Sequence, residues 1–204
     1  MGLYSERIFP YLLDLSMTDV ILGDYRRAAL ANVTGEVLEI GFGTGLNLPY
    51  YPDRIRQLTT VDPSPGVHRL AQKRLAASPI AVDHRMVSGE ALPMGDRSFD
   101  SVVSTFTLCS IPKIESALAE IYRVLKPGGR FFFVEHGLSH EPGIQTWQHR
   151  LTPLQKRIAG GCHLDRAMGQ LIEQQFDQVE LEAAYARQWP KVVGYIYNGV
   201  ATKH

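Results

Sequence analysis

The sequence predicts an α/β fold in which a mostly parallel sheet is covered by helices on both faces. From Gly35 onward, short strand-like runs alternate with segments of helical periodicity, which is the pattern of parallel strands joined by crossover helices. The first apolar run ends in a glycine-rich turn, and the run Phe131–Glu135 is apolar up to its final residue, as expected of a central strand buried on both sides. The length of 204 residues suits one domain.

The first half of the chain contains four of the expected strands. They are Val37–Ile40, Leu58–Asp62, about 81–87 and Phe99–Thr105. Ser64 is expected to cap the helix after the second strand, with Pro65 at the first helical position, where its missing N–H costs nothing. Apolar spacings of three and four predict one buried stripe on that helix.

The second half is expected to begin with a helix from Pro112 to about Leu125, which Pro127 and two glycines terminate. Two more helices are predicted, at about 146–158 and 165–175, the second capped by Asp165. Final strands at 178–182 and 194–201 bring the number of strands to seven. The first thirty residues are expected to form a helix that packs outside the sheet or over the site.

Composition narrows the class of protein. Basic and acidic residues number 21 each. A dedicated nucleic-acid-binding protein should have a basic binding face, so we do not expect this chain to be one. The two cysteines do not make a disulfide framework and fit a reducing compartment. The most apolar N-terminal stretch, Ile8–Leu22, is interrupted by Asp14 and Asp19. It is therefore not expected to span a bilayer, and we expect a soluble cytoplasmic protein.

The turn Gly41-Phe42-Gly43-Thr44-Gly45 is the first candidate site, because glycine lets the backbone approach a ligand closely. Leu46 stands where a dinucleotide fold would have a further glycine, which disfavours NAD or FAD. Glu39, just before the turn, could hold the ammonium group of a bound amino acid. Asp62, at the end of the second strand, could accept hydrogen bonds from ribose hydroxyls. Gly89 and Glu90 could meet an adenine or could form a surface loop.

Four segments together resemble the class I S-adenosylmethionine-dependent methyltransferase motifs, in order and at the usual separations. These segments are 37–45, 61–63, 92–100 and 124–129. The resemblance covers about Gly35 to Glu135 and implies a Rossmann-like, seven-stranded sheet whose last strand is antiparallel. It also implies the cofactor S-adenosyl-L-methionine, with the methionine part at Glu39, Gly41, Gly43, Gly45 and Thr105, the ribose at Asp62, and the adenine at Pro63, Gly89 and Glu90.

A narrower resemblance extends beyond the cofactor half. Segments around Ser88–Glu90, Thr107–Ser110, Val134–His136, Trp147, Gly161–Arg166 and Gly194–Tyr195 are similar to the methyltransferase-like 7 family, the membrane-associated thiol methyltransferases. Bacterial phospholipid and quinone methylases are similar mainly in the cofactor half. The resemblance implies methylation of a small-molecule acceptor, with a thiol, a phospholipid such as phosphatidylethanolamine, and a quinone as alternatives.

The predicted domain therefore has three parts: an N-terminal helical lid at 1–34, a cofactor-binding half at 35–135, and a substrate side with the last strands at 136–204. His136 follows the fifth strand and is the candidate general base, with a purely structural role as the alternative. Tyr11, Trp147, Cys162 and His163 are the candidate acceptor pocket. No metal is expected, because His136, His140 and His149 show no zinc spacing.

Three questions stay open at this stage. A nicotinamide-dependent oxidoreductase and a non-catalytic cofactor-binding protein are the rival functions. The N-terminal segment could contact a membrane surface peripherally. The sequence does not specify an oligomeric state.

Overall fold

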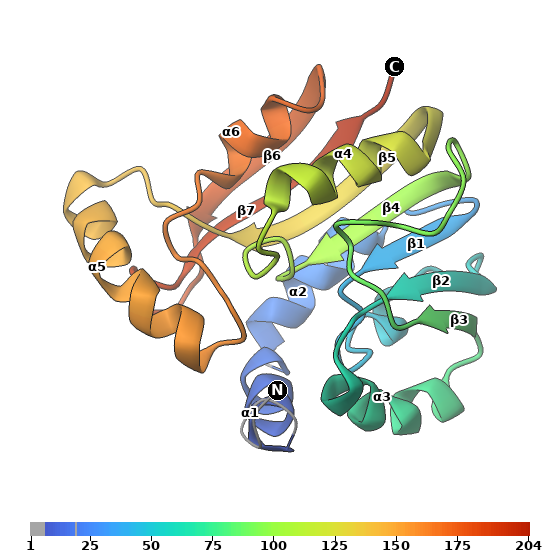
Figure 1. Ribbon diagram of the computed structural model, residues 1–204, viewed down its shortest axis with the longest axis horizontal. Coiled ribbons are helices and arrows are strands. Elements are labelled where there is room, and N and C mark those ends of the chain that lie inside the picture. The colour runs from blue at the N-terminus through green and yellow to red at the C-terminus, as the bar shows by residue number, and fades with distance from the viewer. Residues whose placement is uncertain (1–6, 19) are drawn as a thin grey trace.

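The computed structural model of the protein describes residues 7–18 and 20–204, and its seven strands form one sheet (Figure 1). The strands are β1 (Val37–Ile40), β2 (Gln57–Val61), β3 (Ala81–Arg85), β4 (Phe99–Thr105), β5 (Leu125–His136), β6 (Gln178–Tyr185) and β7 (Tyr195–Thr202). Their order is β3-β2-β1-β4-β5-β7-β6. Only β7 runs antiparallel, pairing with β5 and β6. The predicted fold class is confirmed.

Helices cover both faces of the sheet. They are α1 (Phe9–Met17), α2 (Val20–Leu30), α3 (Pro65–Ala77), α4 (Ile114–Val124), α5 (Pro142–Ile158) and α6 (Met168–Glu173), with a 3₁₀ turn η2 at Leu48–Tyr50. The larger core cluster joins α4 and α6 to one face through side chains such as Leu118, Ile121 and Ile172. A second cluster joins α2 and α3 to the other face through Leu30 and Ala71.

Several element boundaries differ from the sequence-based expectation. Strand β5 begins at Leu125, directly after α4, because Leu125 already pairs with Phe99 before a register shift. Helix α5 begins at Pro142, and α6 is shortened to Met168–Glu173. The prediction that Asp165 caps this helix is wrong, because Ala167 occupies the N-cap position.

The start of α3 also differs from prediction. Ser64 is at the N-cap position, but its side chain makes no capping hydrogen bond. Instead the backbone N–H of Ser64 donates to Asp62 Oδ1 at 2.8 Å. Asp62 therefore binds the N-cap residue itself and couples the end of β2 to the start of α3, and the predicted side-chain cap by Ser64 is absent.

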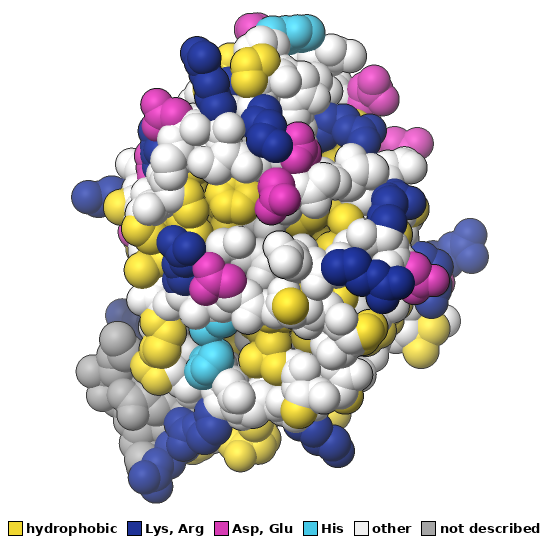
Figure 2. All heavy atoms as spheres, turned by 90° about the vertical axis from the view of Figure 1, so that its right-hand side faces the viewer, with side chains coloured by type: hydrophobic (Ala, Val, Ile, Leu, Met, Phe, Trp, Pro, Cys, Tyr) yellow, Lys and Arg dark blue, Asp and Glu magenta, His cyan; other side chains and the backbone are white. Residues whose placement is uncertain are grey.

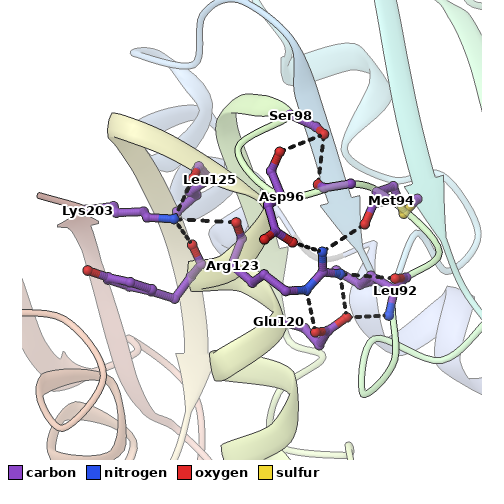
Figure 3. A network of polar contacts seen from close by, with 10 residues as sticks. Leu92, Met94, Asp96, Ser98, Glu120, Arg123, Leu125 and Lys203 are labelled. Carbon is purple, nitrogen blue, oxygen red and sulfur yellow. Dashed lines mark hydrogen bonds and ion pairs between the residues drawn. The ribbon is translucent and has the colours of Figure 1, made fainter.

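The segment before β4, residues 92–98, is held by Arg123 of α4 (Figure 3). Its guanidinium donates to the carbonyls of Leu92 and Met94 and forms ion pairs with Asp96 and Glu120, both at 2.7 Å. These carboxylates raise the pKa of Arg123. On the neighbouring side, the ammonium group of Lys203 donates to main-chain carbonyls around the junction of α4 and β5. Two motif segments, 92–100 and 124–129, thus meet in one polar network with a structural role.

The N-terminal region forms two helices instead of the single helix expected. Helix α2 packs on β5 and β7, whereas α1 lies against α3, beyond the carboxyl edge of the parallel strands (Figure 1). Asp14 of α1 accepts hydrogen bonds from Arg74 of α3 at 2.8 Å and from Thr44 of the glycine turn at 2.5 Å. Arg74 also donates to the carbonyl of Thr44 at 3.0 Å. One helix therefore packs outside the sheet and the other borders the candidate site. Asp19 lies outside the described residues.

Candidate functional site

The glycine turn follows β1 at the carboxyl edge of the sheet, where open α/β folds bind their ligands. Gly41, Gly43 and Gly45 all have positive φ, at 74°, 57° and 79°. A Cβ on Gly41 would overlap the side chain of Thr107, which follows β4. The backbone N–H of Gly41 donates to the carbonyl of Val61 at 2.8 Å, which ties the turn to β2. Glycine is therefore required at Gly41 by both conformation and close approach.

Glu39 lies beneath this turn and is 1% exposed. Its Oε1 accepts from the Asn47 amide at 2.9 Å, and its Oε2 accepts from the Tyr51 hydroxyl at 2.8 Å. The same amide nitrogen of Asn47 contacts Thr105 Oγ1 at 3.0 Å. Burial raises the pKa of Glu39 to about 8, although these donors and the charge of Arg26 oppose the shift. A ligand cation beside Glu39 would favour its ionised form.

Asp62 connects the glycine turn to α3. Its Oδ2 accepts from the backbone N–H of Gly43 at 2.9 Å, and its Oδ1 accepts from Ser64. Burial raises the pKa of Asp62, while these two backbone donors oppose the shift. A carboxylate has about four acceptor positions, so two remain for ligand hydroxyl groups. The imidazole rings of His68 and His84 stack at 4.3 Å and favour the charged form of Asp62.

The remaining residues predicted for the cofactor lie around the same edge. Pro63 is exposed at the end of β2. A Cβ on Gly89 would lie 2.8 Å from the Ile40 side chain, so the loop after β3 passes close to the end of β1. The carboxylate of Glu90 accepts from the Lys113 backbone N–H at 2.6 Å and from Ser88 at 3.1 Å. Glu90 therefore anchors the start of α4 in this structure.

A hollow of about 310 Å³ lies between α3 and the chain at and just before α1. It is lined by Arg7, Tyr11, Gly66, Arg69 and Leu70. Tyr11, predicted for the acceptor pocket, is thus in a surface hollow and is 63% exposed.

A second cluster forms where β4 and β5 end. His136 Nε2 lies 2.7 Å from Cys162 Sγ, and Cys162 Sγ lies 3.8 Å from Cys109 Sγ. His163 follows in the chain and pairs with Asp165 at 3.4 Å. Trp147 is on α5 and is 53% exposed. Of the predicted acceptor-side residues, the structure brings His136 and Cys162 into contact, whereas Tyr11 and Trp147 stand on the separate helices α1 and α5.

Glu135, the last buried residue of β5, organises the loop after β4. It is 0% exposed, and its Oε1 accepts from Ser104 and from the backbone N–H groups of Thr107 and Leu108, at 2.7–3.0 Å. Burial and the neighbouring Cys109 raise its pKa to about 8, against these donors. The loop after β4 therefore places Thr107 against Gly41 and Cys109 against Cys162.

Sequence reasoning missed the residues that support the predicted ones. Asn47 and Tyr51 are absent from the predicted site, although they are only eight and twelve positions from Glu39, and Thr107 is named there only as part of a resembling segment. Their signal was weak, because a single polar residue in a loop has many uses. Cys109 is not among the predicted site residues, because 53 positions separate it from Cys162 and only the fold brings the two side chains together.

Known proteins are similar to this chain in sequence. A profile described as "Methyltransferase domain" matches residues 38–133. The human thiol S-methyltransferase TMT1A is 35% identical over 223 residues, covering 100% of this chain and 90% of that protein. The rat thiol S-methyltransferase TMT1B is 41% identical over 152 residues, covering 72% of this chain and only 62% of that protein. A phosphatidylethanolamine N-methyltransferase of Cereibacter sphaeroides is 33% identical over 149 residues, covering 70% of this chain and 71% of that protein.

The fold has close matches among solved structures. A Thermotoga maritima SAM-dependent methyltransferase, described as a possible histamine N-methyltransferase, aligns with a TM-score of 0.66 over 97% of this chain and 98% of its own, at 20% identity. At this identity the match concerns the fold. The human relative, matched over 90% of its length, and the methyltransferase profile show that the chain belongs to the S-adenosylmethionine-dependent methyltransferases, and its fold is that of class I.

Proposed function

We propose that the protein methylates a small, apolar thiol with S-adenosyl-L-methionine as methyl donor. The binding of the methyl donor is inferred mainly from the buried Glu39 carboxylate, which lies directly beneath a glycine turn in which Gly41 has no room for a side chain. The thiol as acceptor is supported by the relatives, which are thiol S-methyltransferases. Both relatives are longer than the region they share with this chain, the rat protein markedly so.

Each part of the methyl donor is assigned to one group of the residues described above. Glu39 holds the ammonium group of the methionine part, and the glycines at 41, 43 and 45 let its carboxylate approach the backbone. Asp62 accepts from the ribose hydroxyls. Thr105 meets the methionine end, where its hydroxyl already lies beside Asn47.

The adenine would lie in the loop region after β2 and β3. Pro63 offers an exposed apolar face, and Gly89 lets its loop approach the end of β1. Glu90 would keep this loop in place through its hydrogen bond to Lys113.

The acceptor side must align a nucleophile and, for a neutral thiol, receive a proton. The donor supplies a methyl group on a positively charged sulfur, which makes that methyl electrophilic without help from the protein. Alignment of the reacting groups can contribute about 7–11 kcal/mol. His136 is the proposed general base, at the end of β5; to receive a proton on Nε2 it must release its contact with Cys162 Sγ.

The test is a methyl-transfer assay with a panel of acceptors. The 204-residue protein is incubated with isotopically labelled donor and alkyl and aryl thiols, with amines, phenols, quinols and phosphatidylethanolamine vesicles in parallel. We expect labelled thioether from the thiols and equimolar S-adenosylhomocysteine. If phosphatidylethanolamine or a quinol is labelled and no thioether forms, the thiol is wrong and the labelled compound indicates the acceptor class. No transfer to any acceptor by a protein that binds the donor would favour the non-catalytic alternative.

We also propose a cytoplasmic protein that contacts a membrane surface peripherally, which would suit an apolar acceptor. Helix α1 exposes Tyr11, Leu12 and Leu15, and α5 exposes Trp147, Leu151, Leu154 and Ile158 at helical spacing. The two helices are adjacent, since a Cβ on Gly160 would lie 2.6 Å from the Phe9 ring. Figure 2 shows the side of the molecule that carries β3 and α3, opposite α5, and its lower end presents basic, histidine and hydrophobic side chains without an acidic one. Across the described residues, no helix has the length and apolar character needed to cross a bilayer.

A further inference from the structure

Cys109, His136 and Cys162 come from three separate segments and meet at the carboxyl edge of the sheet. Cys109 is in the loop after β4, His136 ends β5, and Cys162 follows α5. One ligand atom from each side chain, two thiol sulfurs and an imidazole nitrogen, lies within 4.8 Å of the others. Both cysteines are buried, at 2% and 6% exposure, and neither forms a disulfide. We propose that these three side chains bind a zinc ion.

The spacing of the sulfurs suits this ion. Zn–S bonds of about 2.3 Å at a tetrahedral angle separate two sulfurs by about 3.8 Å. Cys109 Sγ and Cys162 Sγ lie 3.8 Å apart. His136 Nε2 is 2.7 Å from Cys162 Sγ, whereas a shared zinc ion needs roughly 3.6 Å between nitrogen and sulfur. Binding therefore requires a withdrawal of the imidazole by roughly 1 Å from Cys162.

The chemistry of the set favours zinc over magnesium or calcium. Two thiolates and one imidazole are soft or borderline ligands, whereas hard cations select oxygen. Two thiolates also neutralise the charge of Zn²⁺, which lowers the cost of placing the ion in a buried site. A Cys₂His set leaves the fourth position to water or another ligand, as in catalytic zinc sites.

The surroundings fix the loops that carry the sulfurs. The backbone N–H of His163 donates to the carbonyl of Cys109 at 2.9 Å, which joins the two cysteine loops. The guanidinium of Arg166 donates to the carbonyls of Leu108 and Ile111 on either side of Cys109. Among the described residues, no other residue forms a hydrogen bond with the buried Nδ1 of His136, so the contact of Nε2 with Cys162 is the side-chain contact that must change when an ion binds.

Zinc coordination and general-base catalysis are alternative roles for His136 Nε2, because a nitrogen bound to zinc cannot also receive a proton. The histidine spacing considered in the sequence analysis could not reveal this site. Two of its three ligands are cysteines, and 26 to 53 positions separate the members of the cluster.

The experiment measures metal binding by the 204-residue protein without reference to activity. The protein is reduced with a phosphine, stripped with a chelator, and titrated with Zn²⁺ against a chromophoric chelator. We expect one equivalent of Zn²⁺ to bind. Cys109→Ser and Cys162→Ser should each weaken binding about 100-fold or more, which exceeds the usual effect of losing a residue that only hydrogen-bonds to a metal ligand. His149→Asn is the matched control: His149 is 57% exposed, lies near the same loop and pairs with Asp165, and its variant should bind as the unaltered protein does.

A second measurement needs no variant. Co²⁺ in place of zinc should give the intense visible bands of a tetrahedral site and sulfur-to-metal charge transfer in the near ultraviolet. Absence of these bands together with no zinc uptake by the reduced protein would overturn the proposal. Undiminished binding in both cysteine variants would also overturn it. Formation of a Cys109–Cys162 disulfide in air, with no metal uptake after reduction, would identify the cluster as a thiol pair instead.

Discussion

At the scale of single residues, Glu39 connects burial most directly to ligand chemistry. Its carboxylate is fully enclosed, and burial raises its pKa to about 8 although the hydrogen bonds from Asn47 and Tyr51 oppose the shift. A ligand ammonium group binds best to the ionised form. Below pH 8 the free protein must first lose the Glu39 proton, and binding carries that cost.

The affinity for S-adenosylhomocysteine should therefore rise with pH, by up to about tenfold per unit below pH 8, and level off above it. Calorimetric titration between pH 6 and 8.5 measures this, and proton release should accompany binding. Glu39→Gln keeps the shape of the side chain and removes its titrating carboxyl group. The affinity of this variant for S-adenosylhomocysteine should therefore be lower and nearly independent of pH over this range. An equal pH slope in the variant would show that another group is responsible.

Gly41 gives a second prediction at this scale. A methyl group there meets Thr107 while φ is 74°, so Gly41→Ala should destabilise the protein by at least about 2 kcal/mol and abolish cofactor binding. Gly143→Ala is the matched control, because Gly143 is in the first turn of α5 with nothing within 4 Å of the added carbon. Urea denaturation of both variants tests the difference. A Gly41→Ala protein as stable as the control would contradict the close approach.

At the scale of elements, Arg123 holds the segment before β4 to α4. Removing its guanidinium leaves the Leu92 and Met94 carbonyls without this donor and separates Asp96 and Glu120 from their cation. Arg123→Ala should lower the free energy of unfolding by about 1–3 kcal/mol. Arg85→Ala, which breaks only an exposed pair with Asp83, should change it by less than about 1 kcal/mol. Equal effects in denaturant titrations would refute the structural role of the network.

The exposed stripe of α5 leads to an element-scale prediction about membranes. Leu154→Glu should weaken binding to vesicles of phosphatidylcholine and phosphatidylglycerol by roughly tenfold, the equivalent of one leucine side chain removed from lipid. Met86→Glu is the control, since Met86 is 49% exposed but follows β3, away from this surface. Vesicle sedimentation measures both. If the unaltered protein does not sediment with vesicles, the proposed peripheral contact is wrong.

An element could be predicted from the sequence when the residues that determine it are close to it in the chain. Strand β1, the glycine turn and α4 were predicted well, because apolar spacing and glycines within a few residues determine them. The start of α6 was not predicted correctly. Arg166 donates to the carbonyls of Leu108 and Ile111, more than fifty positions earlier, and this keeps the residues before Ala167 out of the helix. The contact of Cys109 with Cys162 was hidden for the same reason.

At the scale of the whole molecule, one sheet brings two chemically different regions to one edge. The ends of β1 and β2 carry Glu39, the glycine turn and Asp62, whereas the ends of β4 and β5 carry the loop of Cys109 and His136. Thr107 joins them, because it packs on Gly41 and belongs to the loop that Glu135 organises. Helix α1 borders the first region through Asp14, and α5 borders the second.

The central claim is that the edge near Glu39 and Asp62 binds S-adenosylmethionine, and thermal unfolding with S-adenosylhomocysteine tests it most directly. At a ligand concentration about 100 times the dissociation constant, the folded state gains about 2.7 kcal/mol, which should raise the melting temperature by about 5–10 °C. Asp62→Ala should lose this response while NAD leaves the unaltered protein unchanged. No shift at saturating S-adenosylhomocysteine, or a shift with NAD alone, would contradict the account.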